Sequence, residues 1–391
     1  MAEEAGIGAR TARARKLIGW TQARLASESG LSESLVTKVE TGAVPASPAF
    51  VAAVARALKI EPEQLTGAAP YSGSDLPELP GVTEIRRIVA EWDYVDPLPA
   101  VPVARLEAEA RALIRSHDEA RTAETFDLLP GHIRRLYGAL REPDAPVPHL
   151  YSLLCNAYFI TDSSATRVGL TSLKAAVLGR MSALAEQADD PLYRAIAQIQ
   201  RGKVLMYYNV IPSALQAVQR GLDSIEGDGH GATAVRGYGH LSAAIISARG
   251  LNYDTASAYV AEARGLNADR TEYSDRYLTR FGPTNLEIHS CAVELEAGDP
   301  GKAARDGSVL TFPDTMSPTR IGHHWQDVAR AWLLAGEPSK SLAALNRARK
   351  VAPEQTRRHP SVRETVVGIA AAERRSTDSL GSFARWVGVA V

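Results

Sequence analysis

The segment TQARLASESGLSESLVTKVET, residues 21–41, constrains the fold more strongly than any other part of the chain. The hydroxyl of Thr21 can cap a short helix over 22–29, and Gly30 can end that helix because glycine adopts a left-handed backbone at little cost. Ser32 can cap the next helix in the same way. The spacing therefore predicts two short helices joined by a tight turn.

Helical periodicity continues on both sides of this segment. The further helices expected here span 7–18, 48–59 and 62–65. Within the turn motif, Leu25 supplies an apolar contact and Ala26 is small enough to let the two helices cross closely. Residues 1–67 are therefore predicted to form a five-helix domain.

The pattern, including its TQARLA opening and the VETG at its end, resembles the lambda-repressor-like (Xre) helix-turn-helix family over residues 7–67. The resemblance implies a DNA-binding domain whose recognition helix, residues 32–41, lies in the major groove with its N-terminal end toward the base edges. The implied DNA-contacting positions are Gln22 for phosphate and Glu33, Ser34 and Lys38 for bases, with Thr37 beside them.

Several of these assignments have alternatives. Lys38 can donate to guanine O6 and N7, whereas Glu33 either accepts from cytosine N4 or simply suits the positive N-terminus of its helix. Arg10 and Arg13 are candidates for phosphate contacts and equally for solvated surface arginines. Six basic residues against three acidic ones over residues 7–41 give a weak positive excess for phosphates, although the whole chain carries a net charge of −1.

Residues 68–102 are predicted to be a linker with one short helix. The stretch 67–80 is rich in Gly, Pro and Ser, a helix is expected over 82–92, and prolines return over 97–102. Residues 103–391 show helical periodicity broken by Gly, Pro and Asp, without strand-like alternation. The chain is therefore predicted to be all-α.

The helices of this larger region are predicted to come in pairs, near the length of a repeat of about 34 residues. The expected pairs span 103–141, 147–188, 190–227, 232–268, 282–312 and 319–352, followed by terminal helices. In the last pair, Trp325, Trp332, Gly336 and a closing Pro353 resemble the tetratricopeptide (TPR) consensus. The resemblance implies a TPR-like right-handed α-superhelix. The glycines of Gly229–His240 predict a loop between pairs.

In TPR arrays the first helix of each pair lines a groove. Registering the pairs on the consensus predicts these ligand-binding residues: Asn156, Lys203, Tyr207, Asn285, His323, Gln326 and Arg330. The order of domains is similar to that of the RRNPP quorum-sensing receptors, which implies a signalling peptide as effector. A small apolar molecule is an alternative effector. In a second alternative, a protein partner docks to this region and controls the regulator, and there is no small ligand.

Other function classes find little support in the sequence. Phosphate-binding loops, zinc motifs and nucleophile elbows do not occur, so neither an enzyme nor a metal or other cofactor is expected. The start MAEEAGIGAR has no apolar signal core, no apolar run could span a bilayer, and the two cysteines suit a reducing compartment. We therefore expect a cytoplasmic transcription regulator that binds a double-stranded, palindromic operator as a homodimer.

Overall fold

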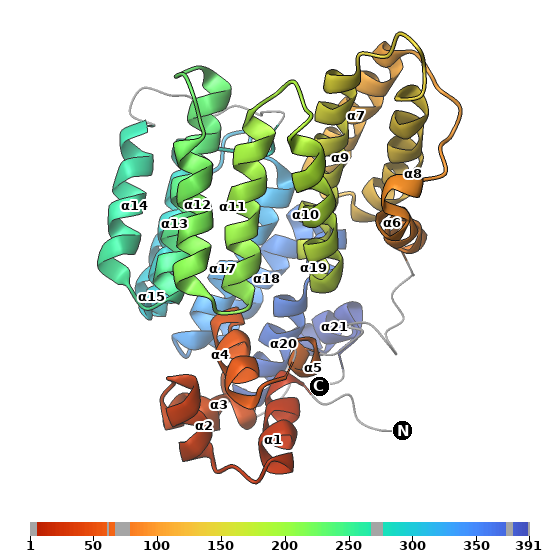
Figure 1. Cartoon of the computed structure of the whole chain (residues 1–391). Coiled ribbons are helices and arrows are strands. Elements are labelled where there is room, and N and C mark those ends of the chain that lie inside the picture. Colours follow the sequence, from red (N-terminus) through yellow and green to blue (C-terminus); the bar gives the residue numbers. More distant parts are fainter. Residues whose placement is uncertain (1–5, 61, 67–78, 267–276, 373–377, 390–391) are drawn as a thin grey trace.

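The computed structural model describes residues 6–60, 62–66, 79–266, 277–372 and 378–389 (Figure 1). Every regular element within these ranges is a helix, which confirms the all-α prediction. Most of the predicted linker 67–80 lies outside the described residues. The short helix expected after it is α6, Pro80–Glu91, and it is followed by the 3-10 turn η1, Trp92–Tyr94.

The first five helices form a small N-terminal bundle with its own apolar core. They are α1 (Ile7–Leu17), α2 (Gln22–Ser29), α3 (Glu33–Glu40), α4 (Pro48–Leu58) and α5 (Pro62–Thr66). The predicted caps are confirmed: the Thr21 hydroxyl accepts from the Arg24 N–H at 3.1 Å, and the Ser32 hydroxyl accepts from the Leu35 N–H at 3.2 Å. Gly30 ends α2 with φ of 71°. These local signals set the angle between α2 and α3.

Close helix crossings in this bundle depend on one small residue. A side-chain Cβ at Gly8 would lie 2.0 Å from the carbonyl oxygen of Val39, so only glycine lets α1 approach α3 this closely. Leu25, Val36 and Phe50 are fully buried between the helices. The backbone of α1 therefore helps to fix the position of α3.

The larger region is a series of antiparallel helical pairs that lie side by side (Figure 1). Each predicted pair corresponds to two helices: α7 (Val103–Asp118) with α8 (Thr122–Ala139), α9 (Val147–Arg167) with α10 (Thr171–Ala185), α11 (Leu192–Tyr207) with α12 (Ile211–Asp223), α13 (His230–Arg249) with α14 (Tyr253–Leu266), α15 (Pro283–Ala297) with α16 (Pro300–Ser308), and α17 (Pro318–Leu334) with α18 (Pro338–Val351). The terminal helices are α19 (Pro353–Arg358), α20 (Pro360–Ala372) and α21 (Asp378–Val387). The helical periodicity thus located every pair.

The prediction of a loop over Gly229–His240 is wrong. Helix α13 begins at His230 with Gly229 as its N-cap, so Gly231, Gly237 and Gly239 lie inside a helix. A Cβ at Gly237 would lie 2.2 Å from the ring of Phe281, and one at Gly239 would lie 2.6 Å from Leu222. These glycines allow close helix packing and do not mark a turn.

Replacing Gly237 with alanine is expected to destabilise the protein by about 1–3 kcal/mol, because the new methyl group overlaps the Phe281 ring. The matched control is Gly179→Ala in α10, where a Cβ meets nothing within 4 Å and alanine favours the helix. Urea unfolding should show a lower midpoint for the first variant only. Equal midpoints would show that the Phe281 ring moves aside freely.

The N-terminal bundle rests against the C-terminal helices (Figure 1). The carboxylate of Glu364 in α20 lies next to the backbone N–H of Ile7, at the start of α1. A Cβ at Gly368, one turn later, would lie 3.5 Å from the ring of Pro45. Helix α4 also contacts α11. The bundle is therefore positioned by contacts with elements far along the chain.

Candidate DNA-reading surface and interior polar cluster

Helix α3 presents three of the predicted base-contacting residues to solvent. Glu33, Ser34 and Lys38 are exposed, whereas Val36 and Val39 on the opposite side are buried. This separation follows from the 3.6-residue period, which places residues 33, 34 and 38 away from the core. The exposed side of α3 can therefore approach a nucleic acid without rearrangement of the bundle.

The other two predicted residues, Gln22 and Thr37, belong to a hydrogen-bonded network that joins α1, α2 and α3. The amide of Gln22 donates to the Glu40 carboxylate at 2.8 Å and accepts from the Thr37 hydroxyl at 3.0 Å. Arg15 donates to both Glu40 oxygens at 2.7 Å and to the carbonyl of Trp20 at 2.6 Å. In this structure the side chains of Gln22 and Thr37 hold α3 in place.

Arg15 and Glu40 form a buried ion pair that the sequence analysis missed. Burial opposes ionisation of Glu40, but the hydrogen bonds from Arg15 and Gln22 outweigh it, so the pKa of Glu40 lies below its usual value. The pair could have been predicted from the helical positions of Arg15 and Glu40, because each lies on the inward-facing stripe of its helix. The pair links the first helix to the end of the recognition helix.

The predicted phosphate contacts Arg10 and Arg13 lie in different environments. The guanidinium of Arg10 donates to the carbonyls of Leu65 and Thr66 at 2.5 and 2.9 Å, which satisfies the C-terminus of α5. Arg13 is exposed on α1. Arg24, which was not predicted, is also exposed and stacks on the ring of Trp20 at 4.7 Å. Arg13 is thus the more available of the two predicted arginines.

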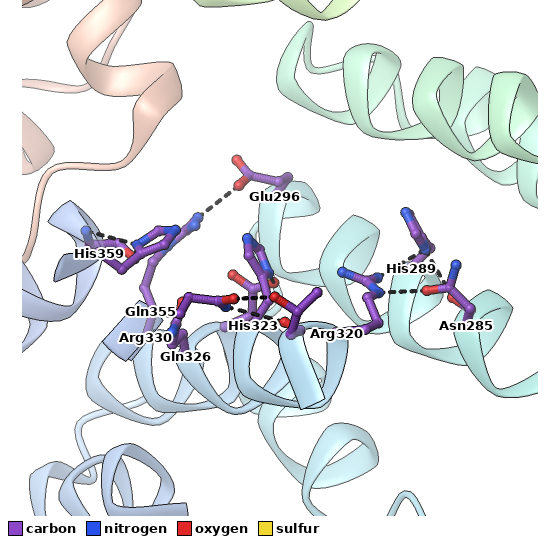
Figure 2. A network of polar contacts seen from close by, with 12 residues as sticks. Asn285, His289, Glu296, Arg320, His323, Gln326, Arg330, Gln355 and His359 are labelled. Carbon is purple, nitrogen blue, oxygen red and sulfur yellow. Dashed lines mark hydrogen bonds and ion pairs between the residues drawn. The ribbon is translucent and has the colours of Figure 1, made fainter. Parts of the chain in front are cut away.

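Three of the predicted ligand-binding residues meet deep in the larger region. Lys203 donates to the hydroxyl of Tyr238 at 2.8 Å, and that hydroxyl donates to Gln200 at 2.7 Å. Asn285 is buried and accepts from Nε of Arg320 at 2.5 Å (Figure 2). His323 lies 3.1 Å from the carboxylate of Asp327, and its ring contacts that of His359.

The remaining predicted ligand residues serve helix packing. Gln326 donates to the Thr356 hydroxyl at 3.2 Å, and Arg330 pairs with Glu296 at 2.9 Å (Figure 2). Asn156 is buried inside α9. Tyr207 is half-buried, and the guanidinium of Arg249 lies 5.9 Å from its ring. Tyr207 also lies close enough to Lys203 to raise the pKa of that lysine.

We define the interior polar cluster by side chains from five helices that influence one another electrostatically. Its members are Arg167, Lys203, Tyr238, Asn285, His289, Arg320 and His323. The sequence analysis missed Arg167, Tyr238, His289 and Arg320. Arg320 could have been found, because it precedes His323 by three residues and so shares its side of α17.

Burial has a strong effect on the charged members of this cluster. Desolvation, together with repulsion from the guanidinium group of Arg320, lowers the pKa of Arg167 to about 10. Desolvation likewise lowers the pKa of Arg320 to about 10. The pKa of His289 lies well below its usual value because of burial and the nearby Arg320, so its imidazole is neutral near pH 7. Arg320 therefore has a neutral His289 beside it.

Two surface hollows lie outside this cluster. One of about 410 Å³ is bordered by Arg264, Glu287 and Leu310, and one of about 370 Å³ is bordered by Trp92, Tyr137 and Arg180. Neither contains a predicted ligand residue.

The two cysteines lie in different environments. Both cysteines are free thiols. Cys155 is buried, whereas Cys291 is half-buried, and burial raises the pKa of Cys291 to about 11. Within the described ranges no group of His, Cys, Asp and Glu could hold a metal ion. Among the described helices, none has both the length and the apolar character needed to cross a bilayer.

Three comparisons with known proteins were informative to different degrees. The larger region contributes to a weak structural likeness to BtubC (BKLC) from P. vanneervenii, with 14% identity and a TM-score of 0.33 over 63% of this chain and 91% of that one. A search of curated proteins gives no match. Residues 4–66 match the family model described as a helix-turn-helix domain. The N-terminal bundle is therefore a helix-turn-helix domain, which indicates a DNA-binding regulator.

Proposed function

We propose that this chain is a sequence-specific transcription regulator in which α3 reads base edges in the major groove. The observation that carries the proposal is the exposure of Glu33, Ser34 and Lys38 on a helix whose other side is locked to α1 by the Arg15–Glu40 pair. A rigidly held helix can place side chains against bases with little loss of conformational freedom. The all-helical fold of the chain and its helix-turn-helix domain favour regulation over catalysis.

The operator is proposed to be a palindrome read by a homodimer. One small helix-turn-helix domain makes few phosphate contacts, so it binds weakly alone, and pairing two copies doubles the contacts. Half-sites would then be separated by about one helical turn of DNA, or a multiple of it. Native mass spectrometry of the full chain checks this part, and a protein that stays monomeric on its operator would contradict it.

We further propose that residues 103–391 are a TPR-like right-handed superhelix that binds an effector, a peptide or a small molecule, in its interior. The stacked antiparallel pairs and the cluster around Arg320 support this. His323 contacts His359, which immediately precedes α20, and α20 carries the Glu364 contact with the reading domain. An effector that moves His323 would therefore shift His359 and α20, and α20 contacts the helix-turn-helix domain.

Replacing Lys38 with alanine tests the reading role. Loss of a base contact is expected to cost about 1–3 kcal/mol, roughly five- to 150-fold in affinity for the preferred sequence, with unchanged folding. Operator selection followed by footprinting measures the change. The matched control is Arg13→Ala, which should weaken all sequences alike because phosphates carry no base identity. Unchanged selectivity of the Lys38 variant would contradict the assignment.

A further inference from the structure

Three cations in the interior polar cluster come from three different helices and form no ion pair with the described carboxylates. Asp118, Asp162 and Asp327 act on them electrostatically, each from beyond ion-pair distance. Arg167 ends α9, Lys203 lies in α11 and Arg320 lies in α17. In the described parts of the chain, no carboxylate lies within ion-pair distance of any of the three. Nearby buried cations differ, because Lys174 pairs with Asp162 at 2.7 Å and Arg330 pairs with Glu296 at 2.9 Å.

The hydrogen bonds of the three cations go to neutral groups. Lys203 donates to the Tyr238 hydroxyl, and Arg320 donates to the Asn285 amide oxygen at 2.5 Å and to Nδ1 of His289 at 3.0 Å. Nε of Arg167 is buried with no hydrogen-bond acceptor. A buried donor without an acceptor is unfavourable, and more so for a charged group. The site thus has donors and positive charge in excess of what the described residues satisfy.

The three side chains are desolvated without being fully packed. Each is surrounded by protein, which lowers the pKa of all three, yet each retains some accessible surface. Lys174, which has its carboxylate partner, is only 2% exposed. A charged group that is poorly hydrated and still partly accessible can be contacted by a small anion without first being exposed by unfolding.

We propose that Arg167, Lys203 and Arg320 bind the anionic oxygens of a small effector, a carboxylate or phosphate group, inside the helical superhelix. This inference rests on the proposed effector function and specifies its ligand class. Guanidinium groups suit such anions because their planar donors match carboxylate and phosphate geometry. The uncharged partners Asn285 and Tyr238 would orient the two cations that they contact.

The experiment compares thermal unfolding of the full chain in chloride, inorganic phosphate and citrate at equal ionic strength. Binding to the folded state raises its stability, so phosphate or citrate at well above the dissociation constant should raise the wild-type Tm by about 2 °C or more. Arg167→Gln should abolish most of that rise. The matched control is Arg105→Gln, an exposed arginine on α7 that should keep the full response. The anion that raises the wild-type Tm identifies the preferred group: phosphate indicates phosphate oxygens, citrate indicates carboxylate oxygens, and a rise with both indicates that the site accepts either.

Loss of fold and loss of the site give different results. In chloride, Arg167→Gln should have a Tm no lower than wild type, because it removes a charge that Arg320 repels. Arg320→Gln should also lose the rise in Tm caused by the anion. This second variant keeps the test valid if Arg167→Gln does not fold. A wild type that responds to neither anion, or an Arg167→Gln variant that responds as wild type does, would overturn the proposal. Lys38→Ala should keep the anion response, so failure of DNA reading and failure of this site are separable.

Discussion

Replacing Glu40 with alanine is expected to unfold or loosen the helix-turn-helix domain and to abolish DNA binding. The change leaves the Arg15 guanidinium, whose side chain is only 9% exposed, without its carboxylate. Breaking one side of a buried ion pair costs about 3–5 kcal/mol, a large part of the stability of a small domain. Hydrogen-exchange mass spectrometry of the full chain should show faster exchange in peptides from α1 to α3.

The control for this variant is Glu28→Ala, which removes an exposed carboxylate from α2 and should leave exchange unchanged. The pH dependence has a definite sign. Because folding lowers the pKa of Glu40, its contribution is present above about pH 4.5 and is lost as the pH falls through its folded pKa. Exchange rates in Glu40→Ala that match wild type at pH 7 would show that the pair contributes nothing.

The second large effect is expected for Asp162→Ala in the larger region. Asp162 accepts from Nζ of Lys174 at 2.7 and 2.8 Å, and it also accepts from Gln200. Both charged side chains are almost completely buried, at 1% and 2% exposure. Removing the carboxylate should therefore cost about 3–5 kcal/mol, measured as a lower urea midpoint for the helical region.

Two further variants make this expectation specific. Asp127→Ala removes an exposed carboxylate of α8 and should leave the midpoint within error of wild type. The double variant Asp162→Leu with Lys174→Met should recover much of the loss, because an apolar pair can replace a buried ion pair. If the double variant were as unstable as Asp162→Ala, packing and not the unpaired lysine would be the cause.

Local signals accounted for most of the fold. The Thr21 and Ser32 caps, the Gly30 turn and the helical period act within a few residues, so they can be seen in a single sequence. The loop expected over Gly229–His240 failed because a glycine has two uses. Whether it marks a turn or a close helix contact depends here on Phe281, more than forty residues away, and no local pattern reveals that neighbour.

The site was harder to predict, because it depends on which side of each helix faces inward. Lys203, Asn285 and His323 were predicted by registering the pairs on the repeat consensus, and they do reach the interior polar cluster. On α17, however, only Arg320 and His323 belong to the cluster. Gln326 and Arg330 contact neighbouring helices. A helix packed on both sides has polar residues on more than one inward stripe, so one register cannot identify them all.

The contact between Ile7 and Glu364 also sets an order of events during synthesis. The helices of the reading domain contact one another within the first 66 residues, so they can assemble soon after they leave the ribosome. The contact that orients this domain requires α20, which emerges some 300 residues later, or about 15–60 s at typical elongation rates. During that interval the nascent chain carries the helix-turn-helix domain without the α20 contact that positions it. A ribosome that stops before residue 360 therefore releases a polypeptide with the reading domain but without that contact.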